Sequence, residues 1–202
     1  MRITPLLLLC LFFFQSRTAW GQSDCPAPIP VAMLDTKIEN IHSAIQNKNL
    51  SQLSQQMEDL TLSIPCLIQP INPKQAAQYH LMQGIYLWIN RNPNLAQLYF
   101  AAAKSVQPGL DIPTDFFPPG HQIHQSFNQA PSLPESEKAT ALPSGEIYFD
   151  GKKTLDRPSL RPTIYQETRG SKVVKSMLLD GNTALPRHEG MSQQAQAQAE
   201  PE

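Results

Sequence analysis

The stretch AQYHLMQGIYLWINRNPNLAQLYFAAAKSVQPGL, residues 77–110, decides the fold of this 202-residue chain. Its apolar residues recur every three or four positions up to Trp88 and again from Leu95, which places them on one face of a helix. Pro93 separates the two runs, because the residue before a proline disfavours helix. An Asn-Pro pair at 72–73 supplies a favoured start for the first helix. The stretch therefore predicts a hairpin of two helices.

This hairpin resembles a tetratricopeptide repeat (TPR), a 34-residue helix–turn–helix unit. Counted from Ala77, the positions that match the family pattern are Gly84, Ala96, Phe100, Ala103 and Pro108. His80 and Leu87 stand where the family usually has Trp and Tyr. The resemblance implies that the helices cross closely at the small residues and that Phe100 fills a groove between repeats. An ordinary amphipathic helix pair is the alternative.

A second helix pair is predicted upstream, over residues 34–47 and 50–64, with the same spacing of apolar residues. We interpret it as a degenerate or capping repeat. Two pairs are few for a continuous core, because a solenoid usually needs three or more repeats. We therefore expect residues 119–130, with Ile123 and Phe127 four positions apart, to form a short helix that covers one exposed end.

Residues 1–21 have the pattern of a secretory signal peptide. Arg2 gives a positive start, residues 6–14 are apolar without interruption, and small residues at Ala19 and Gly21 indicate cleavage before Gln22. The apolar run is too short to span a bilayer as a helix, and no later segment is apolar enough to do so. We expect an exported protein, periplasmic or extracellular, with no membrane span in the mature chain.

Export sets the interpretation of the cysteines. Cys10 leaves with the signal peptide, so Cys25 and Cys66 remain in a compartment that permits disulfides. A bridge between them would close a loop worth about 4 kcal/mol in the chain-entropy model. Free thiols are the alternative. No histidine or further cysteine lies at ligand spacing from either residue, so a metal site is not predicted there.

The chain changes character after the helices. A Pro-rich polar segment, 131–142, is typical of a linker. Beyond it, strands alternate with turns, and Asp150-Gly151 is a strong hairpin signal. The expected strands are 146–149, 162–166 and 172–179. The predicted organisation is a helical domain over 22–130, a small antiparallel β-module over 143–181, and a disordered tail over 182–202. The fold class is α+β.

The β-module resembles a PEGA-type domain, a small β-sandwich found on the outside of bacterial proteins. The matching piece is LPSGEIYFDGK, residues 142–152, in which an apolar strand ends in Asp-Gly-Lys. The later Thr-Pro and Gly-His turns of the family are missing. The resemblance implies a surface-attached, non-enzymatic accessory module, and a generic β-hairpin extension is the alternative.

Charge and motifs exclude several classes of function. Losing Arg2 and Arg17 takes two from the 16 basic residues, against 17 acidic ones, so the mature chain is slightly acidic and lacks the charge of a nucleic-acid binder. Phosphate loops, nucleophile elbows, zinc-protease motifs and CxxC pairs are absent from the sequence. His121 and His124 share a helix face but have no third ligand nearby. We expect neither enzyme activity nor a cofactor.

These features predict an exported, non-enzymatic protein–protein interaction or scaffold protein of the bacterial envelope. In the TPR class the first helix of a hairpin usually contacts the partner protein. The residues of that helix outside the apolar stripe, which we take as the candidate partner-binding residues, are Tyr79, Gln83, Tyr86 and Asn90. A structural subunit of an envelope complex with no transient ligand is the alternative.

Overall fold

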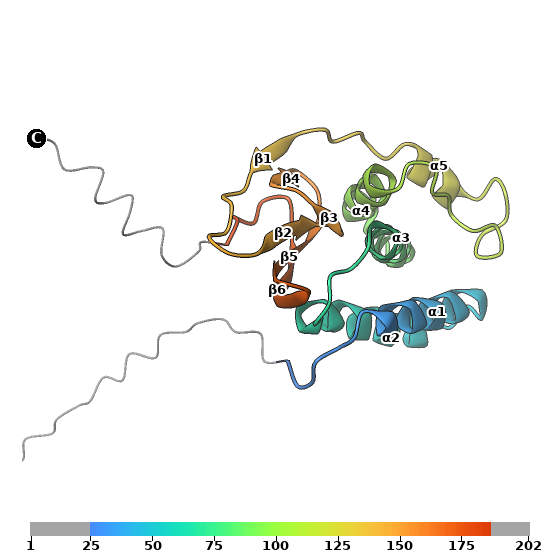
Figure 1. The fold of residues 1–202 in the computed structure, drawn as a ribbon. Coiled ribbons are helices and arrows are strands. Elements are labelled where there is room, and N and C mark those ends of the chain that lie inside the picture. The colour runs from blue at the N-terminus through green and yellow to red at the C-terminus, as the bar shows by residue number, and fades with distance from the viewer. Residues whose placement is uncertain (1–24, 187–202) are drawn as a thin grey trace, which may run out of the picture.

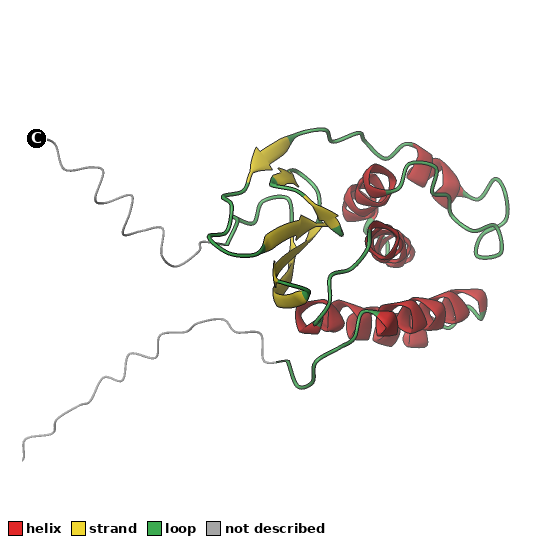
Figure 2. Cartoon of the chain, in the orientation of Figure 1, coloured by secondary structure: helices red, strands yellow, loops and turns green. Residues whose placement is uncertain are grey.

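The computed structural model describes residues 25–186 (Figure 1). The predicted signal peptide and residues 187–202 of the predicted tail lie outside the described residues. Within them the predicted α+β class is confirmed: the helices come first and an antiparallel β-module follows, in a separate region of the molecule (Figure 2). No helix in this part of the chain is both long and apolar enough to cross a membrane.

The helices begin where the sequence offers caps. Asn49, Asn72 and Asn92 each accept a hydrogen bond from the backbone N–H three residues further on. Pro73 and Pro93 occupy first helical positions, where no N–H is needed. The bounds are α1 Ala32–Gln46, α2 Leu50–Ser63, a 3₁₀ turn η1 Ile64–Cys66, α3 Pro73–Ile89, α4 Pro93–Val106 and α5 Gln122–Asn128.

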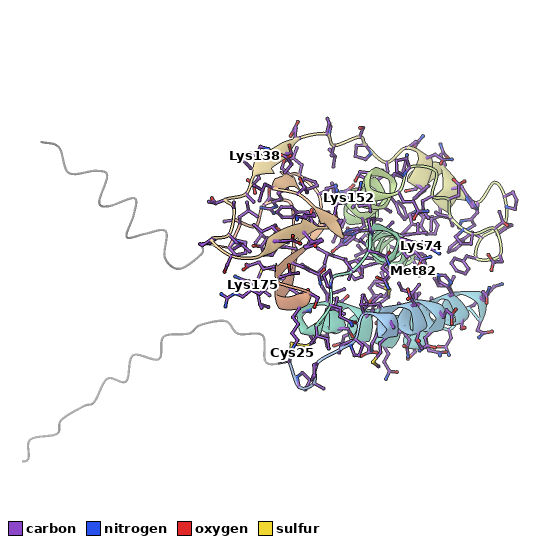
Figure 3. The ribbon with its side chains drawn as sticks, in the orientation of Figure 1. Cys25, Lys74, Met82, Lys138, Lys152 and Lys175 are labelled. Carbon is purple, nitrogen blue, oxygen red and sulfur yellow. A yellow bond between two sulfur atoms is a disulfide. The ribbon has the colours of Figure 1, made fainter. Side chains whose placement is uncertain are left out.

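Helix α3 is the centre of the helical part. It packs against α1 and α2 on one side and against α4 on the other (Figure 1). Met82 lies on the side that faces α1 and α2 (Figure 3), and it is buried. On the α4 side, a Cβ at Gly84 would stand 2.5 Å from the Phe100 ring, so only glycine permits this approach. Helix α3 is therefore buried on more faces than an amphipathic surface helix.

The two helix pairs cross steeply. In Figure 1, α1 and α2 are seen from the side while α3 and α4 are seen nearly along their axes. Successive units of a solenoid instead stack beside their neighbours. The two helix pairs are therefore not stacked side by side as successive units of a regular array.

The predicted short helix over 119–130 is present as α5. Ile123 and Phe127 are buried, and the Phe127 ring meets the Phe100 ring edge-on with centroids 5.3 Å apart. Lys104 on α4 donates to the carbonyl of Asn128 at 3.0 Å. Helix α5 thus covers the outer side of α4, which agrees with the capping role expected for it.

The β-module contains a four-stranded antiparallel sheet in the order β3-β2-β5-β6 and a separate β1-β4 ribbon. The three predicted strands and the Asp-Gly hairpin are confirmed. The strand bounds are β1 Ser136–Lys138, β2 Glu146–Phe149, β3 Lys152–Lys153, β4 Asp156–Pro158, β5 Thr163–Arg169 and β6 Lys172–Leu179.

The predicted linker and tail boundaries need correction. Strand β1 lies inside the segment 131–142 and pairs with β4, and Ala139 after it is buried. Buried Arg157 contacts both segments. Its guanidinium donates to the Glu137 carboxylate at 2.6 Å and to the carbonyls of Asp180 and Thr183, the latter at the start of the predicted tail. These contacts join residues far apart in the sequence, so no local pattern announces them.

The structure pairs Cys25 with Cys66 in a disulfide, with Cα atoms 5.3 Å apart (Figure 3). The backbone N–H of Ile29 donates to the Cys66 carbonyl at 2.9 Å, and that of Ile68 donates to the Ile29 carbonyl at 3.1 Å. Ile68 then accepts from the N–H of Val173 on β6 at 3.1 Å. The disulfide-linked segment is therefore hydrogen-bonded to an edge of the sheet.

The close approach of α3 and α4 gives a test. We expect Gly84→Ala to lower the free energy of unfolding by about 1–3 kcal/mol, because the new methyl overlaps the buried Phe100 ring. In a Phe100→Leu background the same change should cost less, since the smaller side chain leaves room and alanine favours helix over glycine. Urea unfolding followed by circular dichroism measures both. An equal cost in the two backgrounds would contradict the assigned contact.

Candidate functional site

The principal buried polar cluster joins α3 to the β-module. The Asp150 carboxylate lies between His80 of α3 and Arg161, which precedes β5. The three residues are 1%, 0% and 4% exposed, respectively. Charged groups are rarely this buried unless they are paired, so the cluster is the first candidate for a functional centre.

The β2–β3 turn places Asp150 at the cluster. Asp150 and Gly151 are its two central residues and have φ of 50° and 77°, as a type I′ hairpin turn requires. A Cβ at Gly151 would stand 2.5 Å from the carbonyl carbon of Asn72 and 2.7 Å from the nitrogen of Pro73. Glycine therefore lets the turn press against the start of α3. His80 follows about two helical turns later.

Three donors satisfy the carboxylate of Asp150. Oδ1 accepts from His80 Nε2 and from the backbone N–H of Ile164, both at 2.8 Å, and Oδ2 accepts from Arg161 Nη1 at 2.8 Å. The N–H of Asp150 also donates to the carbonyl of Ile164 at 2.8 Å. Because an ionised carboxylate can only accept, the Nε2 atom of His80 carries a proton in this contact.

Opposing effects set the pKa of Asp150. Burial raises the pKa, but the attraction of His80, its hydrogen bond, the charge of Arg161 and the N–H of Ile164 together outweigh burial. The pKa of Asp150 therefore lies below its ordinary value. The carboxylate is held in its ionised form by its partners, which is the expected state for an acceptor of three hydrogen bonds.

We call the cluster of Asp150, His80 and Arg161 the clamp, because these side chains hydrogen-bond to one another and join α3 to the β-module. A cleft of about 260 Å³ reaches Asp150 and Arg161 from the end of α4. Both carboxylate oxygens nevertheless already accept hydrogen bonds, and Arg161 Nη1 is shared between Asp150 and the carbonyl of Pro162. The second ring nitrogen of His80, Nδ1, is buried without a hydrogen-bond partner in the described chain.

The four predicted partner-binding residues have different positions. Tyr79 is 2% exposed and belongs to the core, so its prediction as an accessible contact residue needs correction. Burial raises the pKa of its phenol. Asn90 is exposed, and its side chain donates to the carbonyl of Tyr86 at 2.9 Å, where it caps the end of α3. Gln83 and Tyr86 face a cleft.

That cleft lies between α2 and α3 and has a volume of about 320 Å³. The residues that line it are Ser54, Met57, Glu58, Thr61, Leu62, Gln83 and Tyr86. The hydroxyls of Tyr86 and Ser54 are 3.1 Å apart and bridge the two helices. Gln83 Oε1 is buried and has no hydrogen-bond partner among the described residues. We call this surface the α2–α3 cleft.

His121, the N-cap of α5, and His124 within it both contact Phe117 in the preceding loop. His121 Nδ1 accepts from the N–H of Ile123 at 3.3 Å, and its ring contacts the rings of Trp88 and Phe117. His124 Nε2 is 3.0 Å from the carbonyl of Phe117. No cluster of three or more potential metal-ligating side chains occurs within residues 25–186.

No protein-family model matches the chain, and no curated protein or solved structure matches it significantly.

The clamp generates a prediction about stability. We expect Asp150→Asn to lower the free energy of unfolding by about 3 kcal/mol or more, because Arg161 loses its buried counter-charge. Asparagine tolerates a positive φ, so the change adds little backbone strain. Asp156→Asn is the matched control: Asp156 is exposed and pairs with exposed Lys138, and its loss should cost no more than about 1 kcal/mol.

The loss of stability at low pH should also depend on the Asp150 carboxylate. Because the pKa of Asp150 is lowered by folding, its contribution is complete above the ordinary aspartate pKa and is lost as the pH falls from about 4 towards the lowered value. Urea titrations should therefore show a steeper acid loss of stability in the wild type than in Asp150→Asn. Parallel pH profiles for the two proteins would show that Asp150 is not the group responsible.

Proposed function

We propose that this chain is an exported, non-enzymatic protein–protein interaction protein of the bacterial envelope, and that a partner polypeptide binds in the α2–α3 cleft. The observation that carries the proposal is a cleft between two helices whose lining combines apolar and polar side chains. Leu62 of α2 is 65% exposed, and Tyr86 and Gln83 line the cleft from α3. Interfaces typically combine such apolar contact with a few placed polar groups.

The non-enzymatic part of the proposal is supported by the chemistry of the clamp. Its titratable groups bond to one another, and Asp150 is kept ionised by neighbours rather than poised near neutrality. A general acid or base works best with a pKa near the operating pH. The polar cluster is thus better suited to fixing the β-module on α3 than to proton transfer.

Export is supported by two independent features. Residues 1–21 have the signal-peptide pattern, and Cys25 and Cys66 are joined in a disulfide, which is rare in reducing compartments. The resemblances of 77–110 to a TPR and of 142–152 to a PEGA-type module suggest the same setting. They suggest an accessory protein in the periplasm or on the cell exterior, with α3 as part of its binding surface.

A structural subunit of an envelope complex is the second candidate. It is favoured by an exposed apolar surface beside the disulfide, where Ile68 and Val174 are 39% and 52% exposed. Large exposed apolar side chains that gather on one surface often mark an interface. A permanent subunit should oligomerise or precipitate when purified alone, whereas an adaptor should be a monomer in light scattering.

Site-specific photocrosslinking tests the proposal. A photoreactive phenylalanine analogue is placed at Gln83 or Tyr86 in the exporting bacterium, with Lys74 as a control, because Lys74 is an exposed residue of the same helix (Figure 3). We expect one crosslinked partner from the two cleft positions and none from position 74. Equal crosslinking from all three, or none from the cleft, would contradict the proposed surface.

A substitution adds a quantitative test. Tyr86→Ala is introduced into the variant that carries the photoreactive residue in place of Gln83. It should reduce the yield of crosslinked product about tenfold, because aromatic anchors contribute a large share of interface energy. Circular dichroism shows whether the variant keeps its helices. An undiminished product from a folded variant would remove Tyr86 from the interface.

A further inference from the structure

The hairpin formed by β5 and β6 carries a group of basic residues at its turn. Residues 168–179 contain Arg169, Lys172 and Lys175 and no acidic residue. Arg169 is paired with Lys172, and Glu167 is paired with Lys175. Paired residues, and residues two apart in one strand, point to the same face of a sheet, so the three cations share one face. We call Arg169, Lys172 and Lys175 the basic face.

Little negative charge opposes the basic face. Arg169 and Lys172 are exposed, and no ion pair of the described chain includes either of them. Lys175 Nζ is 3.8 Å from the Glu167 carboxylate, which is beyond hydrogen-bond distance. Glu167 is 8% exposed and accepts a hydrogen bond from the Tyr165 hydroxyl at 2.8 Å. Three cations beside one carboxylate give this end of the hairpin an excess of positive charge.

Accessible apolar side chains adjoin the basic face. A cleft of about 260 Å³ lies between β6 and the disulfide-linked segment, and the residues that line it include Ile68, Val173, Val174 and Lys175. Val174 is 52% exposed and Ile68 is 39% exposed. The N–H of Val173 donates to the carbonyl of Ile68 at 3.1 Å, which holds the two segments together. The structure therefore presents apolar surface to solvent directly beside a cation of the basic face.

Two other occupants fit this surface less well. A second copy of the chain in a symmetric dimer would place cations opposite cations, which repel one another. An extended peptide that added a strand to β6 would need the outer backbone groups of that strand. The N–H of Val173 is already bonded to Ile68, and the Ser176 hydroxyl is bonded to the carbonyl of Ile64 in η1, so neighbouring segments cover part of this edge.

We infer that the basic face docks the β-module on a lipid bilayer that contains anionic headgroups. The three cations contact lipid phosphates, while Val174 and Ile68 enter the boundary between headgroups and acyl chains. That boundary offers negative charge and apolar depth together, which matches cations next to accessible apolar side chains. The residues that line this surface include none of those that line the α2–α3 cleft, so the inference goes beyond the proposed function and does not depend on a partner in that cleft.

Vesicle flotation of the purified exported protein tests the inference. We expect the protein to float with vesicles of phosphatidylglycerol mixed with phosphatidylcholine, and to stay behind when the vesicles contain phosphatidylcholine alone. Raising the salt concentration to about 0.5 M should release most of the bound protein, because exposed charges are then screened. Equal flotation with both kinds of vesicle, or flotation with neither, would overturn the inference.

Charge-matched variants locate the contact. Each basic residue near an anionic membrane adds about a fivefold factor to the affinity, so Arg169→Gln with Lys172→Gln should weaken binding at least about tenfold. The control, Lys138→Gln with Lys152→Gln, removes the same charge from other parts of the β-module, away from Lys175 (Figure 3). It should change binding less than about twofold, because distant exposed charges are screened. Equal losses in the two double variants, both folded by circular dichroism, would contradict the assigned surface.

A fluorescent probe distinguishes a bilayer from an acidic polypeptide. Trp88→Phe with Val174→Trp leaves a single tryptophan in the chain that begins at Gln22. Its emission should shift to the blue on the mixed vesicles but not on poly-glutamate, because only the bilayer offers an apolar interior. Tighter binding to poly-glutamate than to the vesicles, or vesicle binding without the blue shift, would overturn the inference that this surface enters a membrane.

Discussion

The buried carboxylate of Asp150 is the contact on which the arrangement of this molecule depends. Removing a charge from water costs several kcal/mol, and that cost is offset only if all its partners are in place. Here the partners come from α3, from the segment before β5 and from the β5 backbone. We infer that the Asp150 carboxylate receives all its hydrogen bonds only when the β-module lies in one position on the helices. The clamp therefore fixes the orientation of the module more than it adds to the free energy of unfolding.

A second set of contacts holds the connector between α2 and α3. The Ser176 hydroxyl donates to the carbonyl of Ile64 at 2.6 Å, and buried Gln166 accepts from the N–H of Ile71 at 2.9 Å. The end of α2 and the start of α3 are thus both bonded to the sheet. The α2–α3 cleft therefore lies between helices whose ends are fixed, and a preorganised surface loses less entropy on binding.

The sequence predicted the parts of the fold that depend on local signals. Asparagine caps, prolines and the Asp150-Gly151 turn each act within a few residues, so the helix pairs and the central hairpin could be placed. Strand β1 could not, because Ser-Glu-Lys has no strand pattern and its partner β4 lies about 20 residues further along the chain. The pairing of His80 with Asp150 joins residues 70 positions apart. Tyr79 was predicted to be accessible but is buried, because α3 is packed on several faces and a single apolar stripe in the sequence does not reveal this.

The most direct test of this account is native-state hydrogen exchange of the whole protein, with the amides of α3 compared with those of β2 and β5. If the clamp joins the helices and the β-module into one cooperative unit, the slowest amides of both should exchange with the same opening free energy, equal to that of global unfolding. A markedly lower opening free energy for the slowest β2 and β5 amides would show that the module detaches while the helices stay folded, and would contradict the central role of Asp150.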